Sequence, residues 1–345
     1  MSRKRTLDAF FSPTVKKTKT ETGAITSSDV ISEEITYCEH QFYPHPIKNL
    51  PASLSRELST LPDQPGREIK DQPDLDLLYF EPFISGSVSR RLFEFLRSEL
   101  PFYRVEYKIK RGGIETQIRT PRQAILLLED TMLIQVIRWT TVFGLDETSK
   151  FDDKGLPVDA NTGFRAVDKR YARYPPRPIP KCLDELRHRT ELATGCKYNF
   201  CLVNYYASGS DSISFHSDDE QFLGRDPAIA SFSLGARRDF LMKHKPPPLN
   251  APSPPSVNAK PLKLPLGSGD MVLMRGRTQS NWLHSIPKRT GKNQEDGGRI
   301  NITFRRAMVK GGTDNYYNYN IGTGPVYRWN REAREMLLWK PCVQM

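Results

Sequence analysis

Short runs of apolar and aromatic residues, separated by polar residues and glycines, recur from residue 74 to residue 310. Runs of this length predict strands that are buried on at least one face. A first strand is expected from Leu75 to Phe83. The later runs that predict strands are 198–206, 228–234, 238–242 and 271–274.

Three other segments have their own local patterns. Apolar residues recur at helical spacing over 87–100, and Pro101 is expected to end that helix. Residues 103–118 predict a hairpin, with Gly112-Gly113 at its turn. Residues 246–265 are rich in proline and contain no acidic residue, which predicts an irregular loop.

The order of these elements, one helix and then many short strands, predicts a mainly β fold with flanking helices. A double-stranded β-helix, which is a jelly-roll type of barrel, fits this order. The alternative is a β-sandwich without a metal.

Composition divides the chain into a folded part and flexible parts. Only 37% of the residues are hydrophobic and 27 are proline, so one folded domain with long irregular segments is expected. The mixed, Pro- and Ser-rich stretch 27–73 predicts a linker, and folding should begin near Asp74. The expected organisation is a disordered basic region with a linker at 1–73, a domain at 74–310 and a C-terminal extension at 311–345.

The charge balance points to a polyanionic partner. The net charge of +11 favours binding to nucleic acid, because cationic side chains displace counterions from the phosphates. The alternative is a basic tail on a neutral domain.

Cysteine and hydropathy patterns exclude several classes of protein. The five cysteines are odd in number and include no Cys-x-x-Cys pair, which argues against a disulfide scaffold and a structural zinc site. The sequence has no apolar run of about 18 residues, and none follows the starting Met-Ser-Arg-Lys-Arg. A secreted or membrane protein is therefore not expected, and we expect a monomer.

Three residues form a candidate metal site. His216, Asp218 and His284 supply two imidazoles and one carboxylate, the set that holds iron(II) on one triangular face and leaves positions open for co-substrate and dioxygen. On a strand, residues two apart share a face, so His216 and Asp218 would point at one ion. A His-x-Asp pair alone is a weak signal, and the alternative for His284 is a structural histidine.

A polar stripe follows the third candidate ligand. Arg299, Asn301, Thr303 and Arg305 alternate with apolar residues, so one face of a strand is polar. Two arginines that face a barrel interior require anions, and a dicarboxylate suits them because guanidinium binds carboxylate through two hydrogen bonds. The alternative is that the stripe faces solvent.

Several motifs together resemble the AlkB family of iron(II)/2-oxoglutarate dioxygenases, over roughly residues 75–308. The segment 211–220 is most similar to the eukaryotic branch that repairs alkylated DNA. The motifs are Asn204-x-Tyr206, His216-x-Asp218, the run 229–236, His284 and Arg299-x-Asn301-x-Thr303-Phe304-Arg305.

The resemblance implies oxidative demethylation of 1-methyladenine or 3-methylcytosine in DNA. Iron bound by His216, Asp218 and His284 would use 2-oxoglutarate and dioxygen, with release of succinate, carbon dioxide and formaldehyde. The resemblance also assigns the co-substrate residues by position. Arg299 and Tyr206 would hold the distal carboxylate, Arg305 and Asn204 the end nearest the metal, and Asn301 and Thr303 would support them.

Substrate residues follow from the same resemblance. The target atom lies on the Watson–Crick edge, so a base in a duplex must be flipped out. Glu220 matches the acidic residue beside the exocyclic amine of the damaged base, and His216 would form one side of the base sandwich. The remaining candidates are Tyr171 or Tyr174 for stacking, Arg122, and Lys288 and Arg289 for phosphates. Ordinary core residues and a solvated loop are the alternatives for the tyrosines and for Lys288 and Arg289.

One segment departs from the family pattern. In fungal-looking members, a Thr-Pro-Arg segment runs directly into Thr-Thr-Val-Phe-Gly, whereas here the apolar run 123–139 separates 120–122 from 140–144. We interpret this run as translated intron, with a lineage-specific helix as the alternative. Sequencing the transcript across Arg122 to Thr140 distinguishes them, because a spliced message that still encodes the run would exclude the intron.

The N-terminal segment 4–11 resembles the box through which proteins bind the PCNA sliding clamp. One turn of 3₁₀ helix would align Leu7, Phe10 and Phe11 as an apolar plug. Lys4 stands where the family usually has glutamine, and the alternative is a chance cluster. The flanking basic residues predict a nuclear address.

Three functions remain open: a DNA dealkylation enzyme, an RNA demethylase of the same chemistry, and a clamp-bound adaptor with an idle iron site.

Overall fold

The computed structural model describes residues 34–62, 64–104, 106–111, 114–119, 138–165, 175–246, 259–289, 297–309 and 324–340. The segments 1–33 and 123–137 and the residues Arg122, Tyr171 and Tyr174 lie outside this part, so the expected clamp box, most of the expected insertion and three substrate candidates carry no structural account.

A ten-stranded sheet, antiparallel at each pairing, forms the main layer of the fold. Its centre is β11, β18 and β13, and β18 is paired on both sides. The strands in spatial order are β20 (Glu335–Leu338), β19 (Val326–Asn330), β5 (Phe102–Arg104), β8 (Arg138–Gly144), β11 (Phe200–Tyr206), β18 (Arg299–Arg305), β13 (Ile229–Gly235), β16 (Met271–Met274), β4 (Leu77–Phe80) and β3 (Arg67–Ile69).

A four-stranded antiparallel sheet lies against one face of this large sheet. Its order is β12 (Ile213–His216), β17 (Trp282–Ile286), β14 (Arg238–His244) and β15 (Leu262–Leu266). Apolar side chains from both sheets, such as Leu202 and Val272 from the large one and Phe240 from the small one, share one core cluster. The two sheets form the predicted jelly-roll core, which confirms the mainly β fold class.

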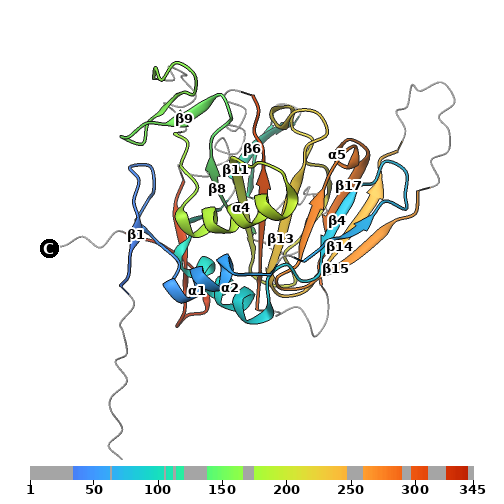
Figure 1. Cartoon of the computed structure of the whole chain (residues 1–345), viewed down its shortest axis with the longest axis horizontal. Coiled ribbons are helices and arrows are strands. Elements are labelled where there is room, and N and C mark those ends of the chain that lie inside the picture. Colours follow the sequence, from blue (N-terminus) through green and yellow to red (C-terminus); the bar gives the residue numbers. More distant parts are fainter. Residues whose placement is uncertain are drawn as a thin grey trace, which may run out of the picture. The chain divides into compact units, whose positions relative to one another are not determined.

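Three helices cover the opposite face of the large sheet. They are α1 (Ala52–Ser59), α2 (Gly86–Glu99) and α4 (Lys181–Thr194), and Figure 1 shows them beside the strands of the large sheet. Leu92 of α2 and Leu186 of α4 pack with Phe232 and Phe304 in a second core cluster. The helix predicted at 87–100 is confirmed, and it ends before Pro101.

The remaining short elements extend from these layers. β6 (Glu106–Arg111) and β7 (Ile114–Arg119) pair as the predicted hairpin, and its expected turn at 112–113 lies outside the described residues. The other elements are β1 (Tyr37–Cys38), β2 (Ile47–Lys48), β9 (Ser149–Phe151), β10 (Pro157–Asp159), the 3₁₀ turn η1 (Gln221–Leu223) and α5 (Thr278–Asn281).

The structure corrects the expected start of folding. Residues within 27–73, read as a linker, form β1, β2, α1 and β3, and Leu54 and Leu58 of α1 are buried in the core cluster beneath the helices. Proline and serine made this stretch resemble a linker, but one face of α1 carries enough leucine to pack on α4, where Ser55 Oγ donates to Glu185 Oε2 at 2.6 Å.

One further segment is more regular than predicted, and the C-terminal extension adds to the large sheet. Within the expected irregular loop 246–265, the last residues form edge strand β15, in which Pro265 is tolerated because only one side of the strand is paired. In the C-terminal extension, β19 and β20 continue the large sheet beside β5. Among the described residues, no helix is long and apolar enough to cross a membrane.

Candidate metal centre

The polar stripe of β18 faces the space between the two sheets. The apolar residues Ile300, Ile302 and Phe304 point toward the helices. The alternate residues face the small sheet, and Arg299 and Arg305 are only 1% and 2% exposed. Two guanidinium groups in such a place are costly unless acceptors or anions meet them, so the solvent-facing alternative for this stripe is excluded.

At one end of the stripe, Arg299 lies in a cradle of polar and aromatic groups. It is the cross-strand partner of Tyr206, and its guanidinium lies 5.4 Å from the centre of the Tyr206 ring. One of its nitrogens, Nη2, donates to Ser233 Oγ on β13 at 2.7 Å. A buried guanidinium between a hydroxyl and a phenol ring is a suitable receptor for a carboxylate.

The middle of the stripe is held by side-chain hydrogen bonds between strands. Asn301 Nδ2 donates to Ser231 Oγ at 2.9 Å and to the Phe232 carbonyl at 2.8 Å. Its cross-strand partner Asn204 accepts a hydrogen bond from Thr140 Oγ1 at 3.0 Å. The Thr303 hydroxyl donates to the Leu202 carbonyl at 3.3 Å.

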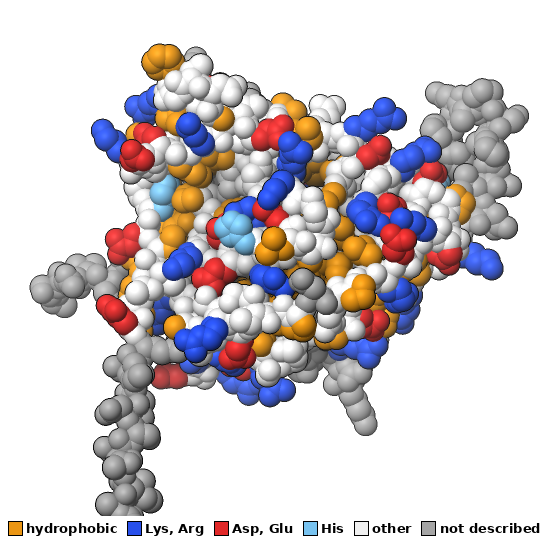
Figure 2. All heavy atoms as spheres, in the orientation of Figure 1, with side chains coloured by type: hydrophobic (Ala, Val, Ile, Leu, Met, Phe, Trp, Pro, Cys, Tyr) orange, Lys and Arg blue, Asp and Glu red, His pale blue; other side chains and the backbone are white. Residues whose placement is uncertain are grey.

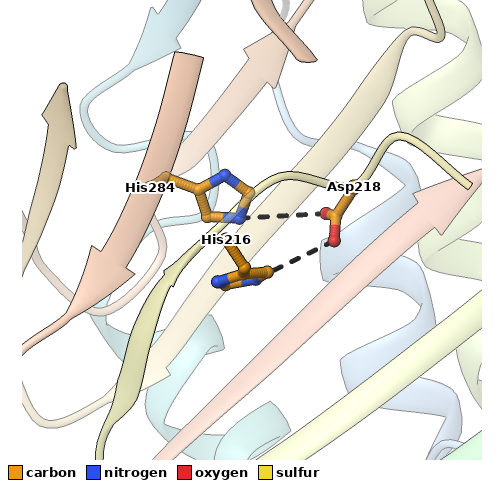
Figure 3. A group of neighbouring side chains, drawn as sticks. All are labelled: His216, Asp218 and His284. Carbon is orange, nitrogen blue, oxygen red and sulfur yellow. Dashed lines mark ion pairs between the residues drawn. The ribbon is translucent and has the colours of Figure 1, made fainter. Parts of the chain in front are cut away.

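The three candidate metal ligands meet beside this wall (Figure 3). His216 is the last residue of β12 and pairs with His284 of β17, and Asp218 follows in the loop after β12. Asp218 Oδ1 is 3.9 Å from His216 Nε2, and Asp218 Oδ2 is 3.9 Å from His284 Nε2. One ligand atom from each residue lies within 4.8 Å of the others, so a single ion could contact all three. The expectation that a strand face presents both His216 and Asp218 was wrong, because the strand ends between them.

Protonation also suits a metal. His216 Nδ1 lies 2.9 Å from the Ser214 carbonyl, which can only accept, so the proton is on Nδ1 and the lone pair on Nε2 faces Asp218. Burial, and then the nearby charge of His216, lowers the pKa of His284 to about 3. With His284 uncharged near neutral pH, the two imidazoles and one carboxylate form a donor set that fits iron(II).

Arg305 joins the ligand loop to the polar stripe. Its Nη2 lies 3.0 Å from Asp218 Oδ2, and its Nη1 lies 3.5 Å from Glu220 Oε1. The side chains of Asp218 and Arg305 are 8% and 3% exposed, whereas those of His216 and Glu220 are 25% and 27% exposed. A large substrate would therefore approach from the His216 and Glu220 side.

Comparison with known proteins assigns the chain to a family. The model of the 2OG-Fe(II) oxygenase superfamily matches residues 76–305, which include the triad and both arginines of the stripe. The chain belongs to the 2OG-Fe(II) oxygenase superfamily. Iron(II), 2-oxoglutarate and dioxygen, the cofactors expected from the sequence, are those of this superfamily.

Within the superfamily, the similar curated proteins are AlkB homologues, which confirms the resemblance drawn from the motifs. The chain is 35% identical over 187 residues to human "Alpha-ketoglutarate-dependent dioxygenase alkB homolog 3", an alignment that covers 53% of this chain and 62% of that protein. It is 28% identical over 245 residues to Arabidopsis thaliana "DNA oxidative demethylase ALKBH2", covering 68% and 67%. It is 36% identical over 134 residues to human "DNA oxidative demethylase ALKBH2", an alignment that covers 39% of this chain and 49% of that protein. The chain thus spans about three-fifths of the length of human alkB homolog 3.

The predicted substrate residues are only partly placed. Lys288 and Arg289 follow β17, where Lys288 is exposed and the Arg289 backbone N–H donates to the Gly209 carbonyl at 2.7 Å. Glu220 lies beside Arg305, at the rim of the triad. Arg122, Tyr171 and Tyr174 are outside the described residues.

Several residues at the site were missed by the sequence reasoning. Ser231 and Ser233 alternate in the quoted run 229–236, and their spacing of two could have placed them on the polar face. Arg238 is 1% exposed and donates to the carbonyls of Asp211 and Pro287 at 2.6 and 2.7 Å. It thereby ties together the loops that precede β12 and follow β17, and no sequence signal distinguished it from a surface arginine.

Proposed function

We propose that this chain removes methyl groups from N-alkylated bases in DNA by iron(II)- and 2-oxoglutarate-dependent oxidation. The observation that carries the proposal is the placement of the buried His284 and Asp218, with His216 at the rim, against a wall that ends in two buried arginines. The similarity to two proteins named DNA oxidative demethylases supports the DNA substrate.

The proposed binding roles are those that the AlkB resemblance implies, and the geometry supports them. The centre held by His216, Asp218 and His284 would supply oxidation of the N-methyl carbon, after which the hydroxymethyl group leaves as formaldehyde. Arg299 and the Tyr206 hydroxyl would bind the distal carboxylate of 2-oxoglutarate. Arg305 would meet the carboxylate nearest the metal, because it already contacts the metal ligand Asp218 at 3.0 Å.

Glu220 is proposed to read the damaged base. Its side chain is partly exposed at the rim and lies two residues beyond Asp218. A carboxylate accepts hydrogen bonds from the exocyclic amine of 1-methyladenine or 3-methylcytosine once that base is flipped out of the duplex. His216, the most exposed of the three ligands, would contact the same base.

Partner, location and organisation are proposals from the sequence. We propose that Leu7, Phe10 and Phe11 bind a PCNA-type clamp, that the protein works in the nucleus as a monomer, and that 123–139 is translated intron. The last two residues of that run are part of β8, where Trp139 packs against Tyr327 with ring centres 4.5 Å apart.

Figure 2 shows basic and acidic side chains interspersed on the visible face, so net charge alone does not mark the path of the nucleic acid.

The test measures succinate and formaldehyde release from matched DNA and RNA oligonucleotides that contain 1-methyladenine or 3-methylcytosine. Turnover on DNA that exceeds turnover on RNA is the expected result, and the reverse order would favour an RNA demethylase. No turnover on either polymer, with bound iron confirmed, would leave the clamp-bound adaptor.

The clamp proposal has a separate test with purified clamp. Phe10→Ala combined with Phe11→Ala should abolish clamp binding and leave turnover on short oligonucleotides unchanged. Asp218→Ala should abolish turnover and leave clamp binding unchanged. Loss of clamp binding in Asp218→Ala would show that the two functions are not separable as proposed.

A further inference from the structure

The short helix α5 contacts the second metal ligand although it belongs to the segment that carries the third. Gln279 of α5 is 1% exposed, and its Oε1 accepts a hydrogen bond from the backbone N–H of Asp218 at 2.9 Å. α5 leads directly into β17, which carries His284. The positions of two ligands that are 66 residues apart in sequence therefore both depend on α5.

Lys245 attaches the neighbouring residue of the ligand loop to the same helix. Its Nζ donates to Asp219 Oδ2 at 2.8 Å and to the Gln279 carbonyl at 3.0 Å. Its backbone N–H donates to the Asn281 carbonyl at 2.6 Å. Because the Asp219 side chain is about half exposed, the ion pair contributes little to stability, and its effect is to fix where the loop lies.

α5 is itself anchored to the sheets. The backbone N–H of Asp76, next to β4, donates to Thr278 Oγ1 at 2.9 Å, and that hydroxyl donates back to the Asp76 carbonyl at 3.2 Å. The amide of Gln279 is held at its other end, where Nε2 lies 3.1 Å from Met274 Sδ in β16. The acceptor that meets Asp218 is therefore mounted on a rigid support.

Asp218 needs such support because β12 ends at His216. The loop that carries its carboxylate is outside the strand ladder, and the pairing of β12 with β17 is already irregular between Ile213 and His216. A ligand in an unpaired loop loses conformational freedom when metal binds, which weakens binding unless the loop is ordered beforehand.

We propose that Gln279 and Lys245 are positioning residues that hold the Asp218 loop in register with His284 and so raise the metal affinity of the site. This inference rests on the proposed iron centre and assigns its supporting residues. The alternative is that Gln279 is a core residue whose polar ends merely happen to be satisfied, in which case its loss affects folding and not metal binding.

The experiment titrates Co(II), an air-stable probe of the iron site, into the metal-free full-length protein and follows its absorption bands. The melting temperature of the metal-free protein is measured for each variant. Gln279→Met removes the acceptor at similar volume, whereas Gln279→Glu keeps an acceptor at the same reach. Lys245→Met is matched by Lys263→Met, which makes the same change in an exposed lysine–aspartate pair, Lys263 Nζ to Asp239 Oδ2 at 2.8 Å, between β15 and β14.

We expect Gln279→Met to weaken Co(II) binding by about 10-fold or more, the usual effect of losing an outer-sphere partner, and Gln279→Glu to restore most of the affinity. Lys245→Met should weaken binding several-fold and Lys263→Met should not. Gln279→Met that binds Co(II) as tightly as wild type would overturn the inference. Equal losses in Gln279→Met and Gln279→Glu, with equally lowered melting temperatures, would also overturn it. If wild type binds no Co(II), the proposed iron centre itself fails.

Discussion

Replacing Arg299 by methionine tests how 2-oxoglutarate is held. The guanidinium is 1% exposed and is braced by Ser233 Oγ and the Tyr206 ring, so a carboxylate that reached it would form a charge-assisted hydrogen bond away from water. A bond of this kind contributes about 1.5 to 3 kcal/mol, which corresponds to about a 10- to 100-fold change in affinity. Arg299→Met should raise KM for 2-oxoglutarate by that factor. Because Arg299 is at the far end of the stripe from Arg305 and the triad, kcat should fall much less.

The assay measures succinate formation against 2-oxoglutarate concentration at a saturating level of methylated oligonucleotide. Arg306→Met is the matched control, because Arg306 follows the same strand but is about half exposed and pairs with Glu147. Circular dichroism of both variants confirms that each is folded. An unchanged KM for 2-oxoglutarate in Arg299→Met, or an equal rise in Arg306→Met, would refute the assignment.

Three other predictions concern the base, the core and pH. Glu220→Gln should lower kcat/KM for methylated DNA by about 10-fold, because a charged acceptor is lost. The KM for 2-oxoglutarate should stay unchanged, and equal effects on both constants would contradict a role of Glu220 in binding the base. Leu58→Ala should lower the free energy of unfolding by about 2 to 5 kcal/mol. Leu192 of α4 is 74% exposed, so Leu192→Ala should lower it by under about 0.5 kcal/mol. Urea unfolding measures both changes, and equal values would place α1 outside the core. Burial lowers the pKa of His45 to about 4, so the unfolded chain takes up the proton first and stability present above pH 6.5 is lost as pH falls toward 4. The loss amounts to at most about 3 kcal/mol, and His45→Phe should flatten that part of the curve of unfolding free energy against pH.

The residues of the site were predictable where the chemistry requires a particular side chain. His216, Asp218 and His284 follow from the donor preference of iron, and the alternation from Arg299 to Arg305 follows from the period of a strand. Both signals are local in sequence or fixed by chemistry, so the two-sheet fold brought these residues together as expected.

The supporting residues could not be predicted, because their roles depend on contacts between distant segments. Gln279 is an ordinary polar residue in the sequence, and only the packing of α5 beside the Asp218 loop gives it a partner. The prediction for the segment around α1 was wrong for a related reason. Its prolines and serines are typical of a linker, and its two leucines are buried only because another helix packs against them.

Loss of a methyl group from a defined oligonucleotide is the direct sign of oxidative DNA demethylation by this chain. Single-stranded DNA with one 1-methyladenine is incubated with the protein, iron(II) and 2-oxoglutarate, and its mass is measured. Wild type should convert the oligonucleotide to the mass of the unmethylated strand, omission of 2-oxoglutarate should prevent conversion, and Asp218→Ala should leave the mass unchanged. An unaltered mass with wild-type protein that holds iron at the triad, or full conversion by Asp218→Ala, would contradict this function.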